Sequence, residues 1–132
     1  MDIQAIVSLD RTECAVQCNS KKRILEIIAD IAAKQNENID QATVLNSLMA
    51  RERMGSTGIG NGIALPHGRL PGLEKVIAIV VTSTPAIDFD ALDEKHRHRR
   101  LVFAQQVQKR ILQIRRAITL PGFGLFWTRS CR

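Results

Sequence analysis

The sequence predicts a mixed α/β fold in which helices flank a sheet. Three observations support this class: two segments with helical spacing of apolar residues, a β-branched run at 76–83, and a glycine-rich segment at 56–65 that no helix would accommodate. The 132 residues are close to the commonest length of one domain, roughly 100 to 150 residues. We therefore expect a single domain with its own hydrophobic core.

The first helix is predicted over residues 21–35, in KKRILEIIADIAAKQ. Ser20 is a suitable N-cap, because its hydroxyl can accept a hydrogen bond from a free amide of the first turn. Asp30 and Lys34 are one turn apart and can pair on the outer side. The buried stripe is expected to consist of Ile24, Ile27, Ile28 and Ile31.

A second helix is predicted to begin after Asp40, another potential N-cap, and to stop at Gly55 after Met54. Only residues 36–39 separate it from the first helix, so the two form a helical hairpin. Its buried stripe is expected to consist of Val44, Leu45, Leu48 and Met49.

Strands are predicted beyond the second helix. The run VIAIVVTS at 76–83 is rich in β-branched residues and ends before Pro85. The segment STGIGNGIAL at 56–65 is too rich in glycine to continue the helical spacing of apolar residues. We expect both segments to belong to a sheet that the helices cover. The glycine-rich segment and His67 then lie at the edge of this sheet.

The net charge of +6 is unevenly distributed along the chain. Residues 1–95 carry all 13 Asp and Glu side chains, whereas residues 96–132 carry nine Lys and Arg and no carboxylate. We therefore divide the chain into a domain, 1–95, and a basic tail, 96–132. The tail opens with HRHRR, which does not suit a buried strand, and its apolar residues allow a basic amphipathic helix. Those residues are Phe103, Val107, Ile111, Ile114 and Ile118.

The sequence favours a cytoplasmic protein without membrane insertion, because its first residues do not resemble a signal peptide and no apolar run approaches roughly 18 residues. Cys14, Cys18 and Cys131 are an odd number of cysteines without an export signal, so we expect free thiols. Cys14 and Cys18 lack a second pair of metal ligands. The sequence predicts neither a metal nor an organic cofactor.

His67, in GNGIALPHG at 60–68, is the candidate for chemistry. A neutral imidazole has a free lone pair on one ring nitrogen, which can attack phosphorus or accept a proton. Gly60, Gly62 and Gly68 would let backbone amides approach an anion. The alternative interpretation is a structural histidine whose ring nitrogens are satisfied within the fold.

A phosphoryl group in transit also requires a cation, because its equatorial oxygens are negatively charged. Arg51, Arg53 and Arg69 lie close to His67 in the sequence, although Arg53 alone is more simply a solvated charge at a helix end. The acidic stretch DFDALDE, 88–94, is expected to be a solvated turn rather than a metal site.

The stretch RERMGSTGIGNGIALPHG, 51–68, resembles the signature of a family of phosphotransfer proteins. These are the enzyme IIA components of the fructose and mannitol type in the bacterial phosphoenolpyruvate-dependent phosphotransferase system. The similarity includes SKKRILEIIADIAAKQ upstream and VIAIVVTSTPAIDFDALDEK downstream, so it covers residues 3–95. The nitrogen-regulatory members of the family are the most similar.

The resemblance implies that His67 receives a phosphoryl group from a histidine-containing phosphocarrier protein and that Arg51 stabilises the phosphorylated imidazole. It implies a phosphotransferase if the pocket is intact, without a cofactor. The phosphorylation state would then regulate partners such as potassium-transport or sensor-kinase proteins, and nucleic acid is not an expected partner. The phosphate environment is expected to consist of Gly60, Asn61, Gly62 and Gly68.

After Lys95 the sequence departs from the family, which places there an apolar strand, a second histidine near the site and closing helices. Here no histidine follows His98. We interpret the change as a shifted reading frame or a deletion that removes an interior strand and leaves the C-terminal part degraded; a basic regulatory tail is the alternative. The competing function is a non-catalytic module whose tail binds nucleic acid or an anionic membrane, or an inactive family member.

Overall fold

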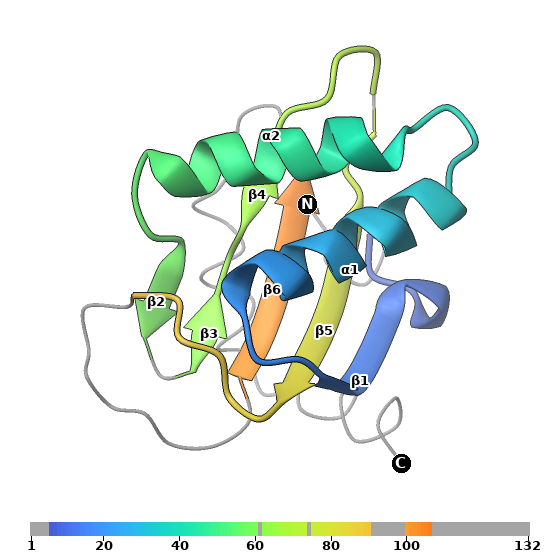
Figure 1. The fold of residues 1–132 in the computed structure, drawn as a ribbon. Coiled ribbons are helices and arrows are strands. Elements are labelled where there is room, and N and C mark those ends of the chain that lie inside the picture. Colours follow the sequence, from blue (N-terminus) through green and yellow to red (C-terminus); the bar gives the residue numbers. More distant parts are fainter. Residues whose placement is uncertain (1–5, 61, 74, 91–99, 107–132) are drawn as a thin grey trace.

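Two helices lie over one face of a six-stranded sheet (Figure 1). The computed structural model describes residues 6–60, 62–73, 75–90 and 100–106, the last of these as backbone. The elements are the 3-10 helix η2 (Leu9–Arg11), strand β1 (Thr12–Gln17), helices α1 (Lys21–Lys34) and α2 (Gln41–Arg53), and strands β2 (Gly58–Gly60), β3 (Ile63–Ala64), β4 (His67–Gly68), β5 (Ala78–Thr84) and β6 (Arg100–Gln106). The mixed α/β class predicted from the sequence is confirmed.

Both helices begin at the predicted caps. The Ser20 hydroxyl accepts a hydrogen bond from the amide of Arg23 at 3.2 Å, which satisfies a free donor of α1. The Asp40 carboxylate does the same for the amide of Thr43 at 2.9 Å in α2. Helix α2 ends just before Gly55, whose φ of 146° is outside the range that a side chain tolerates well.

The hydrophobic core lies between the helices and the sheet. Helix α1 buries three of the four predicted isoleucines and leaves Ile27 partly buried, and α2 buries Val44 and Leu48 while Leu45 and Met49 pack at the margin. Strand β5 and the segment after it supply the opposite side of the core. The largest fully buried side chains of this core are Phe89, Ile24, Leu25, Ile28 and Val81.

Strand β6 occupies the middle of the sheet, in the order β1-β5-β6-β3-β2, and β4 also pairs with it. It runs antiparallel to β5 and parallel to β3 and β4. β1 pairs in parallel with β5 on the other side. A short strand can therefore pair with each end of β6: β3 at Leu101 and Val102, and β4 at Gln105 and Gln106.

The position of β6 corrects two expectations for the segment after Lys95. Residues 100–106 form a strand rather than the start of a helix at Phe103, and an interior strand is present rather than lost. The physical reason is pairing: once β5 offers a free edge, LVFA can extend and form a ladder with it. The predicted helix continues beyond 106 and there lies outside the described residues.

The described cysteines and helices bear on two further predictions. Cys18 is a free, buried thiol, so the expectation of free thiols is confirmed for this cysteine. Among the described residues, neither helix is long and apolar enough to cross a membrane.

Candidate functional site

His67 lies where strand β4 meets the C-terminal half of helix α2 (Figure 1). The Nε of Arg51, in the last turn of α2, donates a hydrogen bond to Nε2 of His67 at 2.9 Å. The imidazole Nδ1 lies 2.9 Å from the carbonyl oxygen of Leu65. The structure therefore brings together Arg51 and His67, the two residues to which the sequence assigned the chemistry.

These two contacts assign the tautomer of His67. A carbonyl oxygen only accepts hydrogen bonds, so Nδ1 must carry the proton that points at Leu65. A guanidinium only donates, so Nε2 must present its lone pair to Arg51. Both contacts indicate the same tautomer, with the proton on Nδ1 and the lone pair on Nε2. The ring is half-buried.

A serine on α2 fixes the position of β4. Ser47 lies one helical turn before Arg51 on the same side of α2. Its hydroxyl donates to the carbonyl of Arg69 at 2.8 Å and accepts from the Arg69 amide at 2.9 Å. A Cβ on Gly68 would overlap Oγ of Ser47 and lie 3.1 Å from its Cβ. Gly68 is therefore required for the close approach of β4 to the helix that carries Arg51.

The other glycines of the predicted phosphate environment have a local explanation. Gly60 and Gly62 have φ values of 88° and 72° in the turn between β2 and β3, a conformation that favours glycine. This turn precedes Ile63, which pairs with Leu101, whereas His67 pairs with Gln105, four residues farther along β6. Four residues of strand span about 13 Å, which is the separation along β6 between the partners of Ile63 and His67.

The phosphate role of Gly60, Asn61 and Gly62 accordingly stays a prediction, and Asn61 lies outside the described residues. Of the other two candidate cations, Arg53 is exposed at the end of α2, and Arg69 is exposed and held through its backbone by Ser47. Arg51 is the arginine that the structure brings into hydrogen-bond contact with His67.

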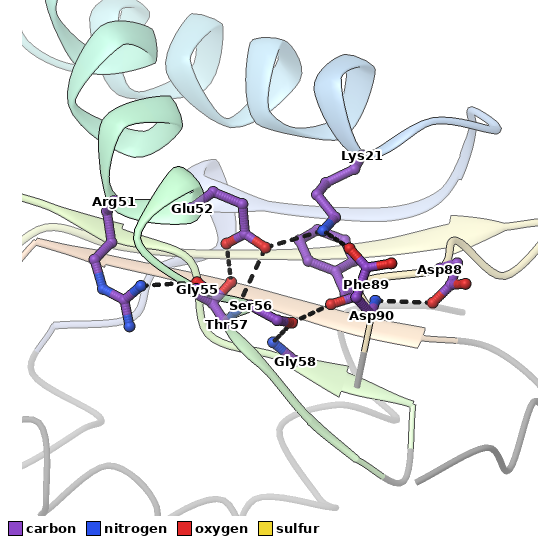
Figure 2. A network of polar contacts seen from close by, with 10 residues as sticks. All are labelled: Lys21, Arg51, Glu52, Gly55, Ser56, Thr57, Gly58, Asp88, Phe89 and Asp90. Atoms are coloured by element: carbon purple, nitrogen blue, oxygen red, sulfur yellow. Dashed lines mark hydrogen bonds and ion pairs between the residues drawn. The ribbon is translucent and has the colours of Figure 1, made fainter. Parts of the chain in front are cut away.

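A second polar network lies beside Arg51 and was not anticipated from the sequence (Figure 2). The carboxylate of Glu52 accepts from the hydroxyl of Thr57 at 2.6 Å and from its amide at 3.4 Å. The same carboxylate lies 3.1 Å from Nζ of Lys21, which also pairs with Asp90 at 2.5 Å. Only 8% of the Glu52 side chain is exposed, so its negative charge requires these partners.

The charge of Lys21 is stabilised within this network. Burial lowers its pKa, but the hydrogen bonds and negative charges of Asp90 and Glu52 outweigh that effect, so the pKa of Lys21 lies above its usual value. Its Nζ also lies 5.4 Å from the centre of the Phe89 ring. As a cation on α1, Lys21 therefore links this helix to Glu52 of α2 and to Asp90 after β5.

The described part of the acidic stretch after β5 packs into the fold at Phe89. Asp88 and Asp90 are exposed as expected, but Phe89 between them is buried, and Ser56 donates a hydrogen bond from its hydroxyl to the Phe89 carbonyl. Asp93 and Glu94 lie outside the described residues. Within the described ranges no group of His, Cys, Asp and Glu side chains could hold a metal ion.

The sequence of the chain matches a known family model. Residues 5–118 match the family described as "Phosphoenolpyruvate-dependent sugar phosphotransferase system, EIIA 2". The chain belongs to this family. The match spans most of the chain and extends beyond Lys95, across the residues that form β6.

Relatives within the EIIA 2 family include nitrogen regulatory proteins. The chain is 44% identical over 91 residues to the nitrogen regulatory protein of Pseudomonas aeruginosa, covering 69% of this chain and 59% of the relative. It is 44% identical over 97 residues to that of Escherichia coli, covering 72% and 58%. The chain thus spans about three fifths of the length of these curated relatives.

Solved structures of EIIA proteins share the fold. The nitrogen regulatory protein IIA-Ntr of Neisseria meningitidis superposes with a TM-score of 0.74 at 29% identity, covering 88% of this chain and 77% of that one. The mannitol IIA of Escherichia coli gives a TM-score of 0.68 at 17% identity, with 86% and 80% coverage. The α/β arrangement that positions His67 and Arg51 is therefore that of the EIIA fold.

Proposed function

We propose that this chain accepts a phosphoryl group on Nε2 of His67 from a phosphohistidine of a histidine-containing phosphocarrier protein, and that its phosphorylation state regulates partner proteins. The observation that carries the proposal is the pair of hydrogen bonds on the imidazole. One keeps the proton on Nδ1, and the other keeps a guanidinium at Nε2. Membership of the EIIA 2 family supports the same function.

In the proposed transfer, one bond to phosphorus forms and one breaks. A bond forms between Nε2 of His67 and phosphorus, and the bond between phosphorus and the donor imidazole breaks, with its electron pair returning to the donor nitrogen. The His67 ring becomes more positive as its lone pair is used. The Leu65 carbonyl stabilises that charge, because it accepts from the Nδ1 proton, which stays on the ring.

Arg51 has to change partners during this step. In the resting chain its Nε occupies the lone pair of Nε2, while its Nη1 donates to the carbonyl of Gly55 at 2.9 Å. A guanidinium carries five N–H donors in a planar fork that suits phosphoryl oxygens. We expect Nε of Arg51 to give up its hydrogen bond to Nε2 of His67 and to donate to the incoming phosphoryl group. The hydrogen bond from Nη1 to the Gly55 carbonyl should remain.

Phosphorylation would alter the surface around α2 and β4. A phosphoryl group adds a charge of about −1.5 to −2, which can strengthen or disrupt an interface. Partners of the potassium-transport or sensor-kinase type would then distinguish the two states by charge at this site. Such regulation follows from the proposed phosphorylation and depends on it.

The test is phosphorylation of the purified chain by phosphoenolpyruvate, the first enzyme of the relay and the phosphocarrier, followed by intact mass measurement. We expect one acid-labile phosphoryl group on the wild type and none on His67→Ala. The chain has three histidines, so a His96→Asn, His98→Asn double variant is the matched control and should still be labelled. A folded wild type without label, or label that survives in His67→Ala, contradicts the proposal.

A further inference from the structure

The two hydrogen bonds on the His67 ring converge on one short segment. On one side of the ring, Nδ1 is hydrogen-bonded to the carbonyl of Leu65, and the Leu65 amide donates to the carbonyl of Thr57 at 2.9 Å. On the other side, Nε2 accepts from Arg51, which also donates to the carbonyl of Gly55, two residues before Thr57. The segment 55–57 therefore supports both nitrogens of the imidazole.

Thr57 is held in place by the residue that follows Arg51 in α2. Its hydroxyl donates to Glu52 at 2.6 Å, a short charge-assisted hydrogen bond, and the residue is only 5% exposed. In Figure 2 the Arg51 side chain reaches Gly55 and the Glu52 side chain reaches Thr57 in the same segment. Consecutive helical residues point about 100° apart, so one contacts the imidazole while the other holds the segment on which that contact depends.

Two further contacts restrain the same segment. Ser56 donates to the carbonyl of Phe89 and accepts from the amide of Gly58 at 3.0 Å. Lys21 neutralises Glu52, so the carboxylate can stay buried and negatively charged while it accepts from Thr57. The segment is thus tied to α1, α2 and the region after β5.

We propose that the Glu52–Thr57 hydrogen bond is a positioning device for the phosphoryl acceptor, which fixes the His67 tautomer with the proton on Nδ1 and the lone pair on Nε2. Glu52 and Thr57 are positioning residues, since the hydrogen bonds of the imidazole are made to Arg51 and Leu65. The consequence for phosphoryl transfer rests on the proposed function, but the tautomer is a property of the unphosphorylated chain and can be measured by itself.

The experiment compares four chains labelled with ¹⁵N-histidine: wild type, Thr57→Val, Thr57→Ser and Thr43→Val. The His67 signals are identified by their loss in His67→Ala. Valine has the shape of threonine without the hydroxyl, and serine restores the hydroxyl. Thr43→Val is the matched control, because the Thr43 hydroxyl also donates to a carboxylate, that of Asp40 at 3.0 Å, at the other end of α2.

We expect the ring ¹⁵N shifts of the wild type, Thr57→Ser and Thr43→Val to report the tautomer protonated on Nδ1. Thr57→Val should raise the fraction protonated on Nε2. With the phosphocarrier relay, Thr57→Val should lower the maximal phosphorylation rate about tenfold, as misplacement of a reacting group does. The phosphocarrier concentration at half-maximal rate should stay unchanged, because Thr57 is buried.

A folded Thr57→Val chain with the wild-type tautomer overturns the proposal, and so does an equal effect of Thr43→Val. If Thr57→Val does not fold, Glu52→Gln is the second test. An amide oxygen accepts a hydrogen bond more weakly than a carboxylate, so we expect a smaller rise in the fraction of His67 protonated on Nε2. An unchanged fraction in Glu52→Gln contradicts the proposal. If the wild type takes no label, the proposed function fails while the tautomer measurement still judges the positioning role.

Discussion

Ala15 has an unusual backbone conformation for a residue with a side chain. Its φ is 56°, and it lies in strand β1 where the pairing with β5 shifts between Glu13 and Val16. Its amide donates to the hydroxyl of Thr82 at 2.7 Å, which holds the irregular turn of the strand against β5. The left-handed conformation costs an alanine roughly 1 to 2 kcal/mol relative to its preferred regions.

Ala15→Gly is expected to raise the free energy of unfolding by about 0.5 to 1 kcal/mol, because relief of the left-handed strain exceeds the added freedom of glycine in the unfolded chain. The control is Ala50→Gly at an exposed position within α2, where the same substitution should cost about 1 kcal/mol. Urea unfolding of the three chains measures both values. Equal destabilisation by the two substitutions contradicts the prediction.

At the scale of elements, strand β4 depends on its fit against α2. Gly68→Ala should lower the free energy of unfolding by about 1 to 3 kcal/mol, because the new methyl group overlaps Ser47. Ser47 is held by two hydrogen bonds to Arg69 and does not move freely. The same displacement should separate His67 from Arg51, so phosphorylation by the relay should slow as well.

A double-mutant cycle isolates this contact. In a Ser47→Ala background the overlapping hydroxyl is absent, so Gly68→Ala should cost less than it does in the wild type. Both costs come from urea unfolding curves. Strict additivity of the two substitutions would show that Gly68 is not required for the approach to Ser47.

Elements with local signals could be predicted from the sequence, whereas those defined by distant partners could not. The caps Ser20 and Asp40 and the apolar stripes act within one helix, so both helices were predicted closely. Strand β1, TECAVQ, alternates only between half-buried and exposed positions, which gives a weak pattern. The 3.6-residue spacing from Phe103 favoured a helix, and pairing with β5 overrode it.

The same division applies to the candidate site. His67 and Arg51 were singled out by a contiguous stretch of sequence, and the structure places them in contact. The network of Glu52 and Thr57 was missed, although an acidic residue five positions before a threonine, with a helix-ending glycine between them, is a signal that could have indicated it. Lys21 and Asp90 are far apart in the chain, and only the packed fold joins them.

At the scale of the whole molecule, Lys21 connects α1 to α2 and to the segment after β5, so its charge should contribute to global stability. Lys21→Met removes the partner of the buried Glu52 carboxylate, and we expect it to lower the free energy of unfolding by about 1 to 3 kcal/mol at neutral pH. Lys22→Met is the control, because that side chain is 70% exposed and 4.0 Å from Glu26, and its loss should change little.

The dependence on pH identifies the charge as the cause. The folded-state pKa of Lys21 is raised, so its contribution is complete below the unfolded-state value of about 10.4 and is lost as the pH rises through the folded-state pKa. The difference in unfolding free energy between wild type and Lys21→Met should therefore be constant from about pH 7 to pH 9 and shrink as the pH rises above the unfolded-state value of about 10.4. A difference that does not shrink would show that Lys21 stabilises the fold through the packing of its hydrocarbon chain, not through its ion pairs.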